Sequence, residues 1–364
     1  MENLTDISGF DAKTNKVIKE FEQEIRNLPS DKQDMVKKFI EEVLLPYLKF
    51  LLDFNEQIKT HKDVDDEFFI KLKENSDNAV QKGEKLTKDL DSKLFEKRLR
   101  YFFRTLISPW PYKSIIMDKG FKKYRGYPGD YEMMDYVYNN KICSNNIFGQ
   151  YFDVYFIRNA YSEAVRGRKN LMRDILLEEI GRQNGLRILN IPCGPSRDVQ
   201  EFLEAKQTNN NFKIVCVDND NESLEFSQKT IFGLEKSENI DFRQGNILDY
   251  SRNPAKAEKD LGSFDIIYSI GIADYFPDKL LQKFIYFTYS MIKPGGKLIF
   301  AFKITNKDPF APLPPKWFCD WVFVPRSLEE SIKVVEESGI KAFTKTKETW
   351  EESGRICFLE YKKG

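Results

Sequence analysis

The chain has 364 residues, in which 57 lysines and arginines balance 57 aspartates and glutamates. This length suits two domains, and the zero net charge provides no overall field that favours nucleic acid or an anionic membrane. No apolar run approaches the length of a membrane span, and the first residues lack the basic and apolar regions of a secretory signal. We therefore expect a cytoplasmic protein with no membrane span and no nucleic-acid partner.

The cysteines are five in number and scattered, without a C-x-x-C pair. An odd and scattered set argues against a disulfide framework and against a structural zinc site. We expect reduced thiols and no bound metal. The residues concerned are Cys143, Cys193, Cys216, Cys319 and Cys357.

Residues 11–108 are rich in Lys, Glu, Asp, Leu and Phe and contain little Gly or Pro. This composition predicts a helical bundle, which we assign to residues 1–115. Pro46 is expected to kink or split one of its helices. Packing, dimerisation or binding of a protein partner are the roles open to this domain. One helical stripe within it comprises Val36, Phe39, Ile40, Val43 and Leu44.

A second segment, residues 116–182, begins with loop residues interleaved with aromatic ones, as in the stretch YRGYPGDYEMM from Tyr124 onward. A mostly helical stretch follows. Gly126 and Gly129 give the loop backbone freedom, which suits a lid that closes over a neighbouring pocket. The alternative is a packed connecting loop. The lid interpretation makes Tyr127, Asp130 and Tyr131 candidate site residues.

Strands and helices alternate through residues 183–364. This order predicts an α/β fold with a doubly wound, Rossmann-like sheet of seven strands. The last two strands are joined by the short loop EESG, so we expect them to form a C-terminal antiparallel hairpin. The predicted organisation is thus an N-terminal α-helical domain, a lid and connector, and a sheet domain.

The first strand and helix of this domain enclose a turn in LRILNIPCGPSRDVQEFL, residues 186–203, where Gly194 is the one glycine. A pyrophosphate needs a glycine-rich turn, whereas a carboxylate needs less room beside the backbone amides. S-adenosylmethionine has such a carboxylate. We therefore expect the amides of this turn to hold the cofactor. The candidate residues are Asn190, Pro192, Cys193, Gly194 and Ser196.

Three later strand ends supply the other expected cofactor contacts. Asp218 ends the second strand, and with its neighbour Asn219 it is placed to accept the ribose hydroxyls. Asn246 and Ile247 would line the adenine, and the stretch Ser269–Ile270–Gly271 would lie beneath the sulfonium. Simpler alternatives are a helix cap for Asp218, a turn residue for Asn246 and a small turn filler for Cys193.

These residues carry a resemblance. Leu186 to Gly364, including MIKPGGKLIF and the terminal hairpin, resembles the class I S-adenosylmethionine-dependent methyltransferases. The first motif departs from the family, which usually has an acid at Asn190 and glycines at Pro192 and Ser196. The stretches RGYPGDYEMM, SEAVRGRKNLM, YSIGIADYF and PPKWFCDWVFVPRS resemble the bacterial branch that includes 3-hydroxy fatty acid methyl ester synthases. That branch implies a carboxylate acceptor on a small or lipid-like (hydroxy fatty) acid.

The composition agrees with such an acceptor, because a carboxylate is ionised at neutral pH and needs no general base. The one histidine, His61, falls in the predicted helical bundle. A cationic or hydrogen-bonding clamp is needed instead, and Arg158, Arg166 and Tyr275 are candidates beside Tyr127 and Tyr131. The arginines could equally be surface ion pairs. Two interpretations are open for the aromatic residues Trp317, Trp321 and Phe323. They line a tunnel for an acyl chain, or they pack the core of a capping segment.

Other functions remain open to this sequence. An N- or protein methyltransferase would use the helical domain to recognise its partner. A nicotinamide-dependent oxidoreductase is disfavoured by the glycine-poor turn, and a non-catalytic binding protein is compatible with the altered first motif. The expected partners are a small-molecule or lipid-like acid and, through the helical domain, a second copy or another protein.

Overall fold

A computed structural model describes residues 12–88, 92–205, 209–340 and 342–364. The chain forms two compact units. The helical unit comprises the described part of Met1–Pro128 together with Lys141–Asn159 and Phe310–Val322, and the sheet unit comprises Gly129–Asn140, Ala160–Pro309 and Phe323–Gly364. The sequence predicts three consecutive segments, 1–115, 116–182 and 183–364. The two units are instead interleaved along the chain, which returns from the sheet unit to the helical unit at Phe310.

The helical unit contains long amphipathic helices whose apolar stripes pack together. All five residues of the predicted stripe from Val36 to Leu44 are buried. Ahead of Pro46 the helix widens into a π-helical turn, which accommodates a residue that has no backbone N–H to donate. Its helices are α2 (Ala12–Arg26), α3 (Ser30–Phe39), η1 (Ile40–Leu44), α4 (Leu45–Gln57), α5 (Asp66–Thr87), α6 (Lys93–Ile107), η2 (Pro111–Lys113), α7 (Ile115–Lys122), α9 (Ile147–Ile157) and α16 (Leu313–Cys319).

Trp317 of α16 lies in the core of the helical unit and has no exposed surface. Its indole N–H donates to Oε2 of Glu84 over 2.9 Å, and its ring lies edge-on to Phe103 with 5.3 Å between ring centroids. Trp321 stacks on Phe156 of the same unit at 6.2 Å. Trp317 therefore packs the helical core, as the simpler of the two alternatives expected.

The sheet unit is built on seven strands in the order β3-β2-β1-β4-β5-β7-β6. The first five strands in this order are parallel, and β7 runs antiparallel to both β5 and β6. This order confirms the predicted doubly wound sheet and its C-terminal hairpin. The strands are β1 (Leu186–Asn190), β2 (Phe212–Asp218), β3 (Ile240–Gln244), β4 (Phe264–Ser269), β5 (Ile292–Lys303), β6 (Phe343–Trp350) and β7 (Ile356–Lys363).

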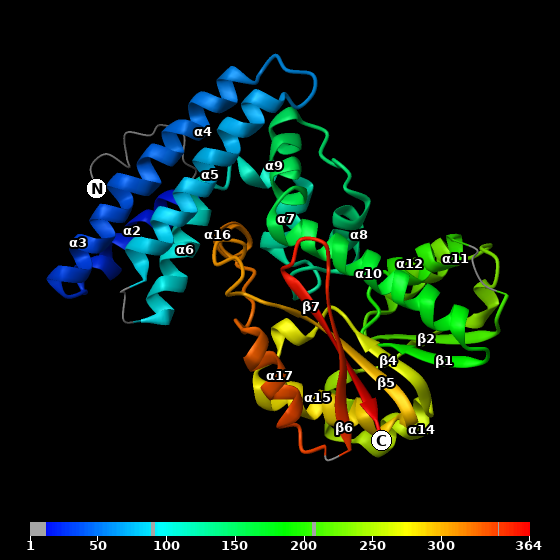
Figure 1. Cartoon of the computed structure of the whole chain (residues 1–364). Helices are drawn as coiled ribbons and strands as arrows, with labels where there is room; N and C mark the ends of the chain where they lie inside the picture. The colour runs from blue at the N-terminus through cyan, green and yellow to red at the C-terminus, as the bar shows by residue number, and fades with distance from the viewer. Residues whose placement is uncertain (1–11, 89–91, 206–208, 341) are drawn as a thin grey trace. The chain divides into compact units, whose positions relative to one another are not determined.

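Helices cover both faces of this sheet. Figure 1 shows α10, α11 and α12 on one face and α14, α15 and α17 on the other. A further helix, α8, occupies part of the segment expected to be a loop, because Asp130 caps it and Met133 and Val137 are buried beneath it. The helices are α8 (Tyr131–Asn139), α10 (Ala160–Arg182), α11 (Arg197–Glu204), α12 (Asn221–Ile231), η3 (Ser237–Asn239), α13 (Ile247–Arg252), α14 (Pro254–Leu261), η4 (Ala273–Tyr275), α15 (Asp278–Ser290) and α17 (Leu328–Glu336).

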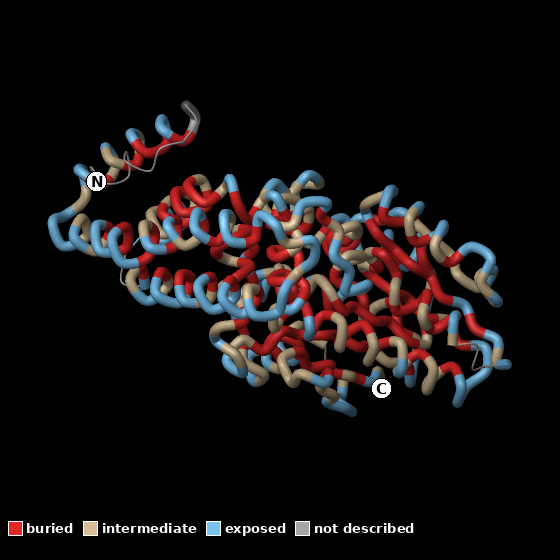
Figure 2. The backbone as a smooth tube through the Cα atoms, turned by 90° about the horizontal axis from the view of Figure 1, so that it is seen from above, coloured by how far each residue is buried: buried red, intermediate tan, exposed pale blue. Residues whose placement is uncertain are grey.

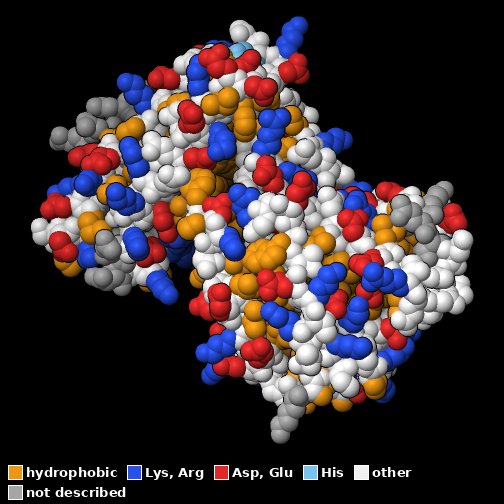
Figure 3. Space-filling model, viewed as in Figure 1, with side chains coloured by type: hydrophobic (Ala, Val, Ile, Leu, Met, Phe, Trp, Pro, Cys, Tyr) orange, Lys and Arg blue, Asp and Glu red, His pale blue; other side chains and the backbone are white. Residues whose placement is uncertain are grey.

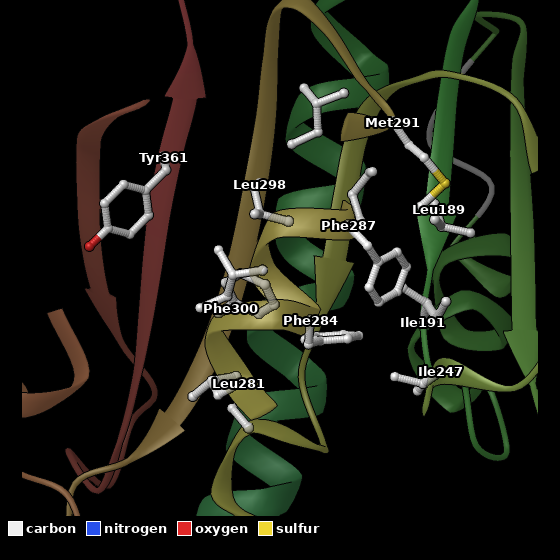
Figure 4. Packing of buried hydrophobic residues seen from close by; sticks show 14 of the residues in the cluster. Leu189, Ile191, Ile247, Leu281, Phe284, Phe287, Met291, Leu298, Phe300 and Tyr361 are labelled. Atoms are coloured by element: carbon white, nitrogen blue, oxygen red, sulfur yellow. The ribbon is translucent and has the colours of Figure 1, made fainter. Parts of the chain in front are cut away.

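The core of the sheet unit lies between α15 and the central strands. Figure 4 shows Phe284 and Phe287 of α15 beside Phe300 of β5 and Leu189 of β1. The central strands are buried along nearly their whole length, as the red band in Figure 2 shows. Strands buried on both faces read as continuous apolar runs, which is why these strands were recognisable in the sequence.

The surface carries charges of both signs. Basic and acidic side chains alternate over the face drawn in Figure 3, in keeping with the balanced composition. Within the described residues no helix has the length and apolar character needed to cross a membrane. The same residues contain no group of three or more His, Cys, Asp or Glu side chains arranged to hold a metal ion.

Candidate active site

The carboxyl ends of β2, β1 and β4 lie side by side, because parallel strands end at one edge of the sheet. The turn after β1 is bonded to the end of β2. Cys193 donates its backbone N–H to the carbonyl of Val217 over 2.9 Å, and Gly194 donates to Oδ2 of Asp218 over 2.9 Å. The turn and Asp218 therefore form a single hydrogen-bonded unit.

Asp218 is 6% exposed, and its Oδ1 accepts a further hydrogen bond from the backbone of Asp220 at 3.1 Å. Burial raises the pKa of this carboxyl above its ordinary value. Each carboxylate oxygen has a second lone pair, so two acceptor positions remain for ribose hydroxyls. The alternative role of a helix cap is wrong, because Asp220 caps α12 by accepting from the amides of Glu222 and Ser223.

The turn amides do not have the role expected from the sequence. Every N–H in the turn already has an acceptor within the protein, and Pro192 and Pro195 have none to offer. A cofactor carboxylate would therefore need a different donor. The four bonds run from Ile191 to the Tyr268 carbonyl, from Cys193 to the Val217 carbonyl, from Gly194 to Asp218 Oδ2, and from Ser196 to the Cys193 carbonyl.

Unpartnered polar atoms nevertheless gather at these strand ends. Asn190 Oδ1, Ser196 Oγ and Ser269 Oγ are buried without a hydrogen-bond partner within the part of the chain that the structure describes. Buried polar atoms are normally paired, so an unpaired group at a strand edge marks a place where a polar ligand or water fits. Ile270 is buried beside Ser269, and Gly271 is half-buried.

Gly194 adopts a left-handed backbone conformation with φ +51°, and a Cβ added there would meet nothing within 4 Å. Open space therefore lies over the turn. Cys193 is buried, and burial raises the pKa of its thiol well above the ordinary value. A thiol held in its neutral form is a poor nucleophile, which leaves Cys193 as turn structure.

Of the two residues expected to line the adenine, Asn246 caps a helix and borders a cavity, whereas Ile247 does neither. Asn246 is exposed, and its side-chain oxygen caps α13 by accepting from the amide of Leu248 at 2.9 Å. Together with Asn219 it lines a polar cavity of about 340 Å³ beyond the ends of β2 and β3. Ile247 is buried and is not part of that lining.

The predicted clamp residues fall in both units. Arg158 lies in the helical unit, where Nη1 is 3.7 Å from Oδ1 of Asp66, and Tyr127 also belongs to that unit. Arg166 lies on α10 of the sheet unit and donates to the Val137 carbonyl at 3.3 Å. Burial lowers the pKa of its guanidinium. Tyr275 lies in the sheet unit, in the cluster described below.

The part of the predicted lid that belongs to the sheet unit contacts α11 and α12. Asp130 is buried and accepts from the Met133 amide at 2.9 Å, so its side chain caps α8. Tyr131 packs on Phe226 of α12 with 5.1 Å between ring centroids. Asp135 of α8 is paired with Arg197, the first residue after the β1 turn. Helix α8 is thereby fixed beside Gly194.

A buried ion pair that the sequence analysis missed lies after β4 and at the end of β5. Lys303 Nζ is 2.8 Å from Oδ2 of Asp274, and the Lys303 amide donates to Oδ1 at 2.9 Å. Lys303 is 4% exposed. Its ammonium lies 4.4 Å from the ring centroid of Phe323, 5.8 Å from that of Tyr161 and 5.9 Å from that of Tyr275. We call these five residues the lysine cluster.

Burial lowers the pKa of Lys303, and Asp274 opposes this effect. The hydroxyl of Tyr161 is buried and has no hydrogen-bond partner within the described part of the chain. One signal could have identified the cluster in advance. Lys303 is a charged residue within the apolar run LIFAFKI, and a lysine in a buried strand requires a partner.

Comparisons with known proteins agree with this architecture. Residues 182–312, which include β1 to β5, match a family model described as a methyltransferase domain. No curated protein sequence matches the chain. A possible exported protein from Bordetella parapertussis has a similar fold, with 15% identity, coverage of 88% of this chain and 97% of that chain, and a TM-score of 0.51.

Two further solved structures are more distant. The N-methyltransferase NodS from Bradyrhizobium japonicum, in complex with S-adenosylhomocysteine, shows 13% identity and a TM-score of 0.40 over 64% of this chain and 97% of that chain. Magnesium protoporphyrin IX methyltransferase from Synechocystis shows 14% identity and a TM-score of 0.40, over 57% of this chain and 88% of that chain. From the matched residues and the strand order, we conclude that residues 182–312 form an S-adenosylmethionine-dependent methyltransferase domain.

Proposed function

We propose that this methyltransferase transfers the methyl group to a carboxylate oxygen of a small or lipid-like acid. The observation that carries the proposal is an excess of hydrogen-bond donors in the lysine cluster. The Tyr161 hydroxyl has no acceptor among the described residues, and the Lys303 ammonium has three N–H groups, of which Asp274 accepts one. A carboxylate offers acceptors alone, so it complements such a site.

The surroundings of Lys303 suit an acid with an apolar portion. The rings of Tyr161, Tyr275 and Phe323 surround the ammonium, and Tyr161 lies edge-on to Phe323 with 5.2 Å between centroids. Water is excluded from such a cluster, which strengthens each remaining electrostatic interaction. The resemblance to 3-hydroxy fatty acid methyl ester synthases makes a hydroxy fatty acid one candidate acceptor.

The chemistry requires little from the protein beyond orientation. Bound S-adenosylmethionine supplies an electrophilic methyl carbon on a sulfonium. An acceptor carboxylate held by Lys303 and Tyr161 forms the new O–C bond as the C–S bond breaks, the electron pair passes to sulfur, and no proton moves. Aligning the two reactants in this way is the main catalytic contribution available to the enzyme.

The lysine cluster is less suited to amine and hydroxyl acceptors, because these must lose a proton and need a general base. Asp274 accepts from the amide and the ammonium of Lys303, so a proton taken up by this carboxylate would break up a buried ion pair. The one histidine, His61, lies in the helical unit, where Nδ1 is 2.9 Å from the Tyr151 hydroxyl. Lys303 would also repel an ammonium group of an amine acceptor.

The lid remains part of this proposal. The loop from Tyr124 to Asp130 leads into α8, which is fixed beside Gly194 through Asp135 and packed on α12 through Tyr131. We propose that the part of the lid in the sheet unit, from Gly129 into α8, covers bound cofactor and acceptor. Tyr127 and Arg158 belong to the helical unit, and we propose that they serve binding of a partner there.

The test is the chemical nature of the methylated product. The enzyme is incubated with S-adenosylmethionine labelled in the methyl group and with a panel of fatty, hydroxy fatty and short-chain acids. Methyl esters release labelled methanol in mild alkali, whereas N-methyl and ether O-methyl groups do not. Alkali-labile label on an acid supports the proposal. Label that resists alkali, on an amine or protein acceptor, would overturn it while leaving the methyltransferase assignment intact.

A further inference from the structure

The guanidinium of Arg168 is buried without an ion pair. The residue lies on α10 and is 5% exposed. Its Nη2 donates to the Tyr138 hydroxyl at 3.3 Å, and Nε has no hydrogen-bond partner in the part of the chain that the structure describes. Among the ion pairs of the described residues, none joins Arg168 to a carboxylate within 4.0 Å. A buried cation in this state is strongly unfavourable, so an anion that completes its bonding has a place here.

Arg168 lies beside the loop that follows β4. A Cβ built on Gly271, just after β4, would lie 3.9 Å from Arg168 Nη2. Tyr138, its hydrogen-bond partner, belongs to α8, which is paired through Asp135 with the residue after the β1 turn. Arg168 therefore lies near the end of β4, which is two strands from Asp218 at the end of β2.

Other donors at this edge are already engaged. The N–H groups of the β1 turn bond to protein acceptors, as described above. The start of α11 carries the buried Asp198, whose Oδ2 accepts from the Tyr268 hydroxyl at 2.6 Å. An incoming carboxylate would meet a second carboxyl group there. Lys303, the neighbouring buried cation, is paired with Asp274. Of these two buried cations, Arg168 is the one whose charge no carboxylate of the described residues balances, and its Nε is an unused donor.

We infer that Arg168 binds the carboxylate of the amino-acid part of S-adenosylmethionine, through the guanidinium that lies beside Gly271 and Tyr138. With the ribose on Asp218 of β2, the amino-acid part extends across β1 towards β4. A guanidinium is suited to this role because its fork matches the two oxygens of a carboxylate. The inference depends on the methyl donor and not on the identity of the acceptor.

Two ligands separate this role from a purely structural one. S-adenosylhomocysteine has the carboxylate, whereas 5′-methylthioadenosine keeps the adenine, ribose and sulfur and lacks the amino-acid part. Calorimetric titration of the full-length protein with each ligand gives two affinities for the wild type and for R168Q, R168K and R182Q. Arg182 is the matched control, because it lies on the same helix, 70% exposed and paired with Glu178.

We expect R168Q to bind S-adenosylhomocysteine roughly 10- to 100-fold more weakly, as the loss of a charged hydrogen bond implies. Its affinity for 5′-methylthioadenosine should stay within about threefold of the wild type, because this ligand has no carboxylate for Arg168 to bind. A threefold change in affinity is smaller than the loss of one charged hydrogen bond would cause. R168K keeps the charge without the fork, so it should fall between, and R182Q should match the wild type for both ligands.

Equal losses for both ligands would show that Arg168 supports the fold of the site and does not bind the carboxylate. Unchanged affinity for S-adenosylhomocysteine in R168Q would also overturn the inference and would leave Arg168 available to the acceptor acid. If R168Q does not fold, R168K decides between these results by the same comparison. If the wild type itself does not bind S-adenosylhomocysteine, the assignment of S-adenosylmethionine as methyl donor is wrong. That outcome is distinct from both results for R168Q.

Discussion

Gly194 donates its backbone N–H to Oδ2 of Asp218 over 2.9 Å, which joins the turn after β1 to the end of β2. The single glycine of an otherwise glycine-poor turn is thereby held by the residue expected to bind the ribose. Because Asp218 also accepts from Asp220, its carboxylate is oriented before any ligand arrives. Pre-orientation of this kind reduces the entropy lost on binding.

Replacing Asp218 by Asn should therefore weaken cofactor binding. The amide keeps one acceptor oxygen but loses the charge, and its NH₂ group faces a backbone N–H. We expect roughly a 10- to 100-fold loss in affinity for S-adenosylhomocysteine, the equivalent of one or two charged hydrogen bonds. 5′-Methylthioadenosine should lose as much, since it keeps the ribose. Calorimetry on D218N measures both, with D220N, at the cap of α12, as the control. Unchanged affinity in folded D218N would remove Asp218 from the site.

Tyr161→Phe tests the donor excess in the lysine cluster. The substitution removes one hydroxyl and preserves the ring beside Phe323. We expect KM for the acid to rise about 5- to 30-fold, which corresponds to one buried hydrogen bond, while affinity for S-adenosylhomocysteine stays unchanged. Y286F, on the exposed face of α15, is the matched control. Steady-state kinetics with the acceptor identified by product analysis measure these KM values. Equal KM values for Y161F and Y286F would contradict a role of the lysine cluster in binding the acid.

The pH profile follows from the same lysine. Burial lowers the pKa of Lys303 below its ordinary value of 10.5. As pH rises through that lowered pKa, Lys303 loses its proton and its charge, so kcat/KM for a carboxylate acceptor should fall on the alkaline side. On the acid side, activity should persist until the acceptor itself protonates at about pH 4–5. Initial rates across this range check both limbs. An acid limb near pH 6.5 would instead indicate a histidine base.

His61→Ala should keep its rate of methyl transfer. The imidazole bonds to the Tyr151 hydroxyl and lies edge-on to Phe68 within the helical unit, so its loss should cost about 1 kcal/mol of stability. Turnover is compared at a temperature where variant and wild type are both folded. A folded H61A that binds cofactor and loses turnover by orders of magnitude would return a histidine base to the mechanism.

Gly83→Ala should destabilise the helical unit although alanine favours helices. A Cβ at Gly83 would lie 2.7 Å from Cη2 of the buried Trp317, which anchors α16. Overpacking of this kind costs about 1–3 kcal/mol. Gly181→Ala, near the end of α10 with nothing within 4 Å of its added Cβ, is the control and should gain up to about 1 kcal/mol. Thermal unfolding of both variants measures the contrast. Equal shifts would contradict the packing of Trp317.

The fold was largely predictable because its strands are continuous apolar runs and its helices separate them in a regular order. Asp218 could be placed in the same way, since the end of a recognisable strand defines its position. Arg168 could not, because nothing in RGRKN distinguishes it from Arg166, and the difference arises only when α10 packs beside α8 and the β4 loop. The turn amides were misjudged for a similar reason: their acceptors Val217 and Tyr268 come from neighbouring strands.

Helix α16 shows the same limit. PPKWFC is separated from α5 by more than 200 residues in the chain, yet Lys316 Nζ lies 2.6 Å from Oε1 of Glu84. No local pattern reports a contact of that range. Helix α8 was predictable from local sequence, in contrast to α16. Asp130 followed by Met133 and Val137 has the spacing of a capped amphipathic helix that begins at Tyr131. The glycines just before it favoured a loop interpretation for the whole stretch.

The most direct test of the donor site is a crystal structure of the protein with S-adenosylhomocysteine. The account predicts ribose hydroxyls within hydrogen-bond distance of the Asp218 carboxylate, with the amino-acid part crossing the open side of Gly194 so that its carboxylate meets the Arg168 guanidinium. A ligand whose ribose lies away from Asp218, or whose carboxylate is held by the backbone amides of the β1 turn, would contradict it.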